Sequence, residues 1–161
     1  MLALNLDSMF FMTQAVAAEL KAQSRPGSLV SIASTSGLNA APFHIGYGTA
    51  KAAIRSVVQT MALELASAGI RVNTVAPGTT ATPVAIAEND LQRDRAAIPM
   101  GRRGKPDEVA GTVLYLLSDL ATYVTGQCIA VDGGATLRWS LIGEDNIPRY
   151  VSASLRESFR E

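Results

Sequence analysis

The chain has 161 residues, of which 48% are hydrophobic and 17% charged, with 14 basic and 14 acidic side chains. A chain of this length and composition can bury the core of one globular domain. The balanced charge argues against a protein that binds nucleic acids or membrane surfaces, because such proteins normally carry an excess of basic residues. The single cysteine, Cys128, excludes an internal disulfide framework and fits a reducing compartment.

The apolar N-terminal segment does not match a targeting signal. It lacks a positively charged leading region, and Asp7 interrupts its apolar run. No stretch of the sequence approaches the roughly 18 consecutive apolar residues of a membrane-spanning helix. We therefore expect a cytoplasmic protein.

The first half of the chain alternates helical and strand-like patterns. Apolar residues at helical spacing predict a helix over residues 5–23, and a short β-branched run predicts a buried strand over 28–34. Helical spacing returns over 46–67, where Gly69 is placed to end the helix. The predicted apolar face of the first helix consists of Leu6, Met9, Phe10, Val16, Ala17 and Leu20.

The second half continues the alternation. Residues 70–76 predict a strand, and the polar segment 79–100 predicts a mobile insertion around a short helical patch. Pro106, followed by two acidic residues, predicts a helix start, and a third strand is expected over 128–131, closed by the turn at Asp132. This order predicts an α/β fold with a doubly wound parallel sheet, in which ligands bind beyond the carboxyl ends of the strands.

Three residues at the end of the first strand and the start of the second helix suggest proton-transfer chemistry. Lys51 follows Tyr47 by four residues, so a helix places both on one face, and Ser34 lies thirteen residues upstream of the tyrosine. A nearby ammonium favours the phenolate of a tyrosine, and such a tyrosine can exchange a proton with an alcohol or carbonyl. The alternative for an isolated Tyr-x-x-x-Lys pair is an ordinary solvated helix face.

The surrounding motifs favour the catalytic interpretation. In chain order they are SLVSIAST, YGTAKAAI, IRVNTVAPGTTATP, GRRGKPDEVA and VTGQCIAVDGG. Together they resemble the short-chain dehydrogenase/reductase family over approximately residues 4–137. The resemblance implies the last three strands of a Rossmann-like sheet and the C-terminal, catalytic half of a family member.

The resemblance assigns roles to four residues. Tyr47 corresponds to the general acid/base, and Lys51 to the cation that supports it and bonds the nicotinamide ribose. Ser34 corresponds to the serine that polarises the substrate oxygen. Asn5 corresponds to the asparagine that holds a water of the proton relay, with a simple helix-start residue as the alternative. The implied reaction is hydride transfer between NAD or NADP and a carbonyl or secondary alcohol.

The segment after the second strand resembles the family's nicotinamide loop. It contains Pro77, Gly78, Thr80 and Thr82, which the resemblance assigns to cofactor binding. His44 falls in the family's substrate-facing loop, and its alternative is a solvated loop histidine. The chain has no other histidine, so we expect no metal site. The residues 132–134 are interpreted as a structural turn near subunit contacts.

The pattern is most similar to that of 3-oxoacyl-carrier-protein reductases. The implied substrate is a small or acyl-carried metabolite such as a 3-oxoacyl thioester. Dehydrogenases of cyclic dihydrodiols or other small alcohols are the alternative, because they share stretches like GYGTAKAA and LLSDLA. We expect substrate choice to depend on the loops at 35–46 and 79–100.

The resemblance also implies a missing N-terminal nucleotide-binding half, including the glycine-rich turn that cradles the pyrophosphate. We therefore expect residues 1–137 to form part of a Rossmann domain, and 138–161 to be an extension, either an interface or disordered. The strand at 28–34 would have an unpaired outer edge and apolar surface around it. We therefore predict that the chain forms a homo-oligomer, pairs with full-length subunits or aggregates. The rival function is an inactive truncated member acting as an interaction module.

Overall fold

The computed structural model describes residues 1–83 and 91–137, and the expected extension 138–161 lies outside this part of the chain. A π-helical turn, Ala3–Asp7, leads into the first helix. The helices and strands are α1 (Ser8–Ala22), β1 (Gly27–Ile32), α2 (Ile45–Leu65), β2 (Ile70–Pro77), α3 (Leu91–Ala97), α4 (Pro106–Leu117) and β3 (Cys128–Val131). The predicted order of helices and strands is therefore confirmed, with small shifts at the ends.

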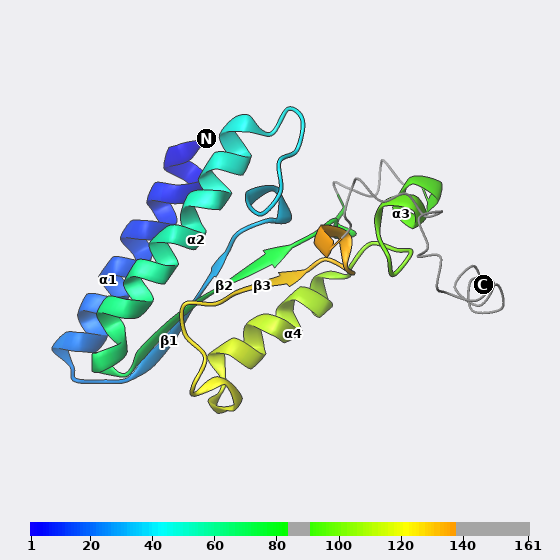
Figure 1. Ribbon diagram of the computed structural model, residues 1–161. Coiled ribbons are helices and arrows are strands. Elements are labelled where there is room, and N and C mark those ends of the chain that lie inside the picture. Colours follow the sequence, from blue (N-terminus) through cyan, green and yellow to red (C-terminus); the bar gives the residue numbers. More distant parts are fainter. Residues whose placement is uncertain (84–90, 138–161) are drawn as a thin grey trace, which may run out of the picture.

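The strands form a parallel sheet in the order β1-β2-β3. Ser31 of β1 lies opposite Thr74 of β2, which lies opposite Cys128 of β3. The helices α1 and α2 cover one face of this sheet and α4 covers the other (Figure 1). The α/β, Rossmann-like architecture predicted for this part of the chain is confirmed, and its three parallel strands direct their carboxyl ends to one edge.

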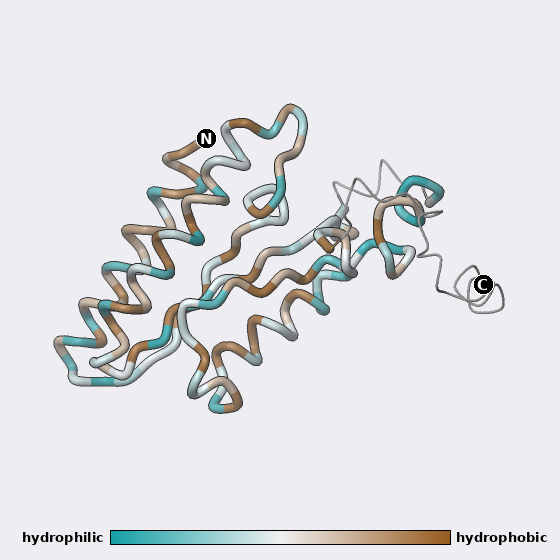
Figure 2. The backbone as a smooth tube through the Cα atoms, viewed as in Figure 1, coloured by the Kyte–Doolittle hydropathy of each residue, from teal (hydrophilic) through white to brown (hydrophobic). Residues whose placement is uncertain are grey.

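Two hydrophobic clusters hold the layers together. On one face, Ile54 and Val58 of α2 pack with Ile70 and Val72. On the other face, Leu116 of α4 belongs to the second cluster and is fully buried. Brown and teal residues alternate along α1 and α2, as expected for helices with one buried side (Figure 2).

Local signals account for the element boundaries. Gly69 has a φ of 71°, the left-handed conformation that ends a helix at little cost for glycine. At the start of α4, the Glu108 carboxylate accepts from the Lys105 N–H at 2.7 Å, one half of a capping box. At the other end of α4, the Arg71 guanidinium donates to the carbonyl oxygens of Leu116 and Ser118.

Two expectations about burial are wrong. Val16 was expected on the buried face of α1 but is 42% exposed. Asp94 and Ile98 lie in the expected insertion but are only 5% and 4% exposed. The Asp94 carboxylate accepts from Arg103 Nε at 2.7 Å, and Ile98 packs against Gly133. Their burial depends on partners from other segments, which a local pattern cannot reveal.

Within the described residues, β1 has one strand neighbour, β2. The Ala33 N–H donates to the Val75 carbonyl of β2. Because backbone groups point to alternate sides along a strand, those of Ser28, Val30 and Ile32 point to the outer edge. Ile32 is 43% exposed. An outer edge without a strand partner in the described part of the chain, with an exposed apolar side chain beside it, agrees with the expectation from the sequence.

Candidate active site

Ser34 lies just beyond the carboxyl end of β1. Its Oγ accepts from the Ser36 N–H at 3.1 Å and caps the short 3₁₀ turn Thr35–Gly37. The side chain is half-buried. Because a hydroxyl is both donor and acceptor, this bond leaves its proton available to a substrate oxygen.

Tyr47 and Lys51 lie in the first two turns of α2. The Lys51 Nζ lies 5.6 Å from the centroid of the Tyr47 ring, within the range of a cation–π contact. The same Nζ donates to the Ile32 carbonyl oxygen at 2.9 Å. Burial lowers the pKa of Lys51 from its ordinary value. The predicted pair is therefore brought together, with the ammonium between the tyrosine ring and the edge of the sheet.

Asn5 lies inside the π-helical turn rather than at a helix cap. Its Nδ2 donates to the Met1 carbonyl oxygen at 3.1 Å. Asn5, Ile32 and Lys51 line a hollow of about 320 Å³ between α1 and β1. Asn5 and Lys51 thus face a common space, although their sequence positions are far apart.

The loop after β2 lies at the carboxyl ends of the strands. The Gly78 N–H donates to the Val131 carbonyl at 3.0 Å, and a Cβ at Gly78 would lie 2.7 Å from the Asp132 Cβ. The Thr80 hydroxyl donates to the Gly78 carbonyl at 3.1 Å. Pro77 ends β2, and Thr82 follows in the same loop, half-buried. The loop is therefore anchored against the turn that follows β3.

Three further titratable side chains that the sequence singled out are His44, Asp132 and Cys128. His44 is exposed, and its Nδ1 lies 2.9 Å from the Pro42 carbonyl. Burial raises the pKa of Asp132, but hydrogen bonds from Thr136 and Gly134 outweigh it and hold the pKa below its ordinary value. Burial also raises the pKa of the Cys128 thiol. Among residues 1–83 and 91–137, no group of three potential ligands is arranged to hold a metal ion.

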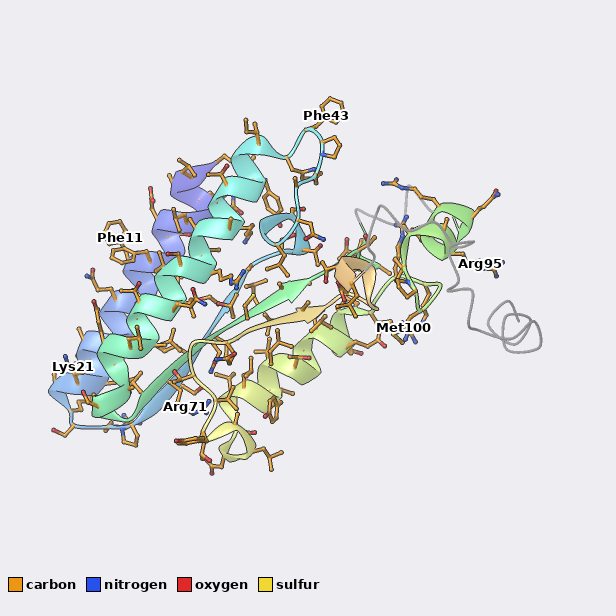
Figure 3. All side chains as sticks on the ribbon, in the orientation of Figure 1. Phe11, Lys21, Phe43, Arg71, Arg95 and Met100 are labelled. Carbon is orange, nitrogen blue, oxygen red and sulfur yellow. The ribbon has the colours of Figure 1, made fainter. Side chains whose placement is uncertain are left out.

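Sequence reasoning missed Phe43. Its backbone has a φ of 64°, and its side chain is fully exposed at the tip of the loop before α2 (Figure 3). The preceding Pro42 signals a turn, but nothing local indicates that a phenylalanine adopts the left-handed conformation there.

Comparisons with known proteins identify the family. A model described as enoyl-(acyl carrier protein) reductase matches residues 1–136. The chain belongs to the short-chain dehydrogenase/reductase family. The family resemblance seen in the sequence is thereby confirmed.

Two curated relatives have different substrates in their names. The chain is 40% identical over 134 residues to L-rhamnose 1-dehydrogenase (NAD(P)(+)) of Azotobacter vinelandii, covering 81% of this chain and 52% of the relative. It is 42% identical over 135 residues to 3-oxoacyl-[acyl-carrier-protein] reductase of Thermotoga maritima, covering 83% and 54%. The chain therefore spans about half the length of the curated relatives it matches.

Solved structures show the same fold. A 4-hydroxyisoleucine dehydrogenase complexed with NADH matches with a TM-score of 0.79 at 30% identity, over 86% of this chain and 59% of that one. Acetoin dehydrogenase of Enterobacter cloacae matches with a TM-score of 0.80 at 34% identity, over 88% and 56%. No helix in the described part of the chain is long and apolar enough to cross a membrane.

Proposed function

We propose that the chain carries the proton-transfer half of a nicotinamide-dependent carbonyl reductase or alcohol dehydrogenase. The observation that supports this most is the Lys51 ammonium, which lies 5.6 Å from the Tyr47 ring centroid and lines the same hollow as Asn5. Tyr47 donates its phenolic proton to the carbonyl oxygen during reduction and takes it back during oxidation. Ser34 donates a hydrogen bond to the same oxygen.

The cofactor of this proposal is NAD or NADP. Bound nicotinamide would supply or accept the hydride. An ammonium has three N–H donors, and the Ile32 carbonyl engages one of those of Lys51, so further donors can reach ribose hydroxyls. Asn5 would hold a water beside Lys51. The nicotinamide amide would lie at the loop that contains Pro77, Gly78, Thr80 and Thr82, where backbone groups gather at the strand ends.

The substrate class we propose is a carbonyl compound such as a 3-oxoacyl thioester. The relative of Thermotoga maritima supports it, whereas the rhamnose-oxidising relative keeps a small alcohol as the alternative. Turnover assays with both classes decide between them. Tyr47→Phe keeps the ring over which Lys51 lies but removes the acid, so we expect at least a hundredfold loss of rate. Turnover that survives this change would contradict the proposed chemistry.

An assembly role is a second candidate, because β1 has an unpaired edge in the described chain. A groove of about 710 Å³ between α1 and α2, bordered by Phe10, Val57 and Met61, also supports a homo-oligomer. On this view the chain would pair with copies of itself or with longer family members without catalysing a reaction. An inactive chain that still associates with a full-length member in size-exclusion chromatography would favour it.

A further inference from the structure

The turn that follows Ser34 meets the helix α2 backbone to backbone. A Cβ at Gly37, the last residue of the turn Thr35–Gly37, would lie 2.5 Å from the Lys51 carbonyl carbon and 2.7 Å from the Ala52 nitrogen. These are backbone atoms in the middle of a helix turn, so they cannot rotate out of the way as a flexible side chain would. The position therefore needs glycine for its close approach to α2.

The contact is reciprocal, because α2 also presents a glycine to the turn. A Cβ at Gly48 would lie 2.8 Å from the Ser36 carbonyl oxygen. Within a helix alanine is more favourable than glycine, so helix propensity does not explain the residue found here, whereas the close approach of the turn does. Gly37 and Gly48 thus form one contact, the glycine joint, where the turn lies beside the first turns of α2 (Figure 1).

Ser34 is tied to this turn by two hydrogen bonds. Its Oγ accepts from the Ser36 N–H at 3.1 Å, and its carbonyl oxygen accepts from the Gly37 N–H at 2.9 Å. The preceding residue is held by the sheet, because the Ala33 N–H donates to the Val75 carbonyl oxygen at 2.8 Å. A displacement of the turn is therefore taken up at Ser34 itself.

Tyr47 and Lys51 lie together on the other side of the joint. Tyr47 directly precedes Gly48, and the Lys51 Nζ lies 5.6 Å from the centroid of its ring. Ala50 of the same helix segment is fully buried, which fixes this part of α2 against the core. The spacing between Tyr47 and Lys51 is therefore internal to α2, whereas the spacing between Tyr47 and Ser34 depends on how the turn docks onto the helix.

We infer that Gly37 and Gly48 are positioning residues that set the spacing between the Ser34 hydroxyl and the Tyr47 phenol. This inference rests on the proposed function, in which both groups bind the same substrate oxygen. A misplacement of about 1 Å at a reacting centre costs roughly a hundredfold in rate. The proposed nicotinamide contacts come from the Lys51 side chain and from the loop after β2, so the joint affects the chemical step rather than cofactor binding.

Amide NMR spectra of the purified chain test the joint without cofactor or substrate. Gly37→Ala places a methyl group against the α2 backbone, so the turn should move away and the Ser36 N–H should lose its bond to Ser34. We expect the Ser36 amide to change its chemical shift and to exchange with solvent about tenfold faster. Gly46→Ala is the matched control on α2, because a Cβ there lies 3.5 Å from the Met1 Cγ, an ordinary contact. An unchanged Ser36 amide in Gly37→Ala would overturn the inference.

Gly48→Ala is a second variant that keeps the test valid if Gly37→Ala folds poorly. Alanine strengthens the helix, while its Cβ presses on the Ser36 carbonyl, so the chain should fold and the Ser36 amide should still be perturbed. In the double variant one displacement of the turn relieves both contacts, so the melting temperature should fall by less than the sum of the two single effects. Fully additive effects would contradict a single joint.

Turnover measures whether the joint acts through Ser34. In the reduction of a 3-oxoacyl thioester, Gly37→Ala should lower kcat roughly tenfold to a hundredfold and leave the KM for NADH or NADPH unchanged. In a Ser34→Ala background the same change should lower kcat by about twofold at most, because no hydroxyl is then left to position. A loss of full size in that background would contradict the positioning role, since general damage to the fold does not depend on Ser34.

The inference and the proposed function fail separately. A chain that reduces no carbonyl compound but shows the Ser36 response would count against the proposed function and support the joint. A Gly37→Ala chain that keeps the full kcat would overturn the inference and leave the proposed function standing.

Discussion

The backbone of Gly78 lies so close to Asp132 that a side chain cannot be added without displacing it. A Cβ there would lie 2.7 Å from the Asp132 Cβ and 2.8 Å from its Cα. We expect Gly78→Ala to lower the free energy of unfolding by about 1–3 kcal/mol, measured by urea denaturation. Gly111→Ala is the control, because a Cβ in that part of α4 meets nothing within 4 Å and should stabilise by up to about 1 kcal/mol. Equal effects of the two changes would contradict the packing described.

At the scale of an element, the start of α4 has an acid-sensitive cap. Hydrogen bonds from Arg102 and from the Lys105 N–H lower the pKa of Glu108 from 4.5 to about 2. Because folding lowers the pKa of Glu108, the stability that its carboxylate adds to the folded state is complete above pH 4.5 and is lost as the pH falls toward 2. Glu108→Gln should therefore remove part of the decline in melting temperature over this interval. Glu64→Gln, on the exposed side of α2, should leave the decline unchanged.

The segment between β2 and α4 depends on a buried ion pair. Asp94 of α3 and Arg103 have side chains that are 7% and 9% exposed, and their charged groups are 2.7 Å apart. Arg103→Met leaves the buried carboxylate without this partner and should destabilise by about 3–5 kcal/mol. The double variant with Asp94→Leu should recover much of that loss. A double variant that is less stable than Arg103→Met would contradict this account.

Local chemistry explains which elements could be predicted. Pro106 and Gly69 act on their own backbones, so the start of α4 and the end of α2 follow from sequence alone. The pairing of Asp94 with Arg103 and the left-handed turn at Phe43 depend on the folded context. The i, i+4 spacing placed Tyr47 beside Lys51, but not the bond from Lys51 to Ile32, because that bond requires the sheet edge to be in place.

At the scale of the whole molecule, we propose that the outer edge of β1 governs association. Ile32 is 43% exposed beside the edge groups. We expect the chain to show a molar mass above 16.9 kDa in light scattering, rising with concentration. Ile32→Lys places a charge at the edge and should reduce association. Leu63→Lys, at an 83% exposed position on α2, is the control. A concentration-independent monomer would contradict this prediction.

We propose that this chain holds the nicotinamide end of a cofactor beside Tyr47 and Lys51. The most direct test is a titration of the purified chain with NADH and NADPH, following nicotinamide fluorescence. We expect saturable binding that Lys51→Met weakens, because the variant loses the donors to the ribose while keeping a long side chain. No binding of either cofactor at millimolar concentration would contradict the claim for this chain. Binding that is unaffected by Lys51→Met would contradict the role assigned to that residue.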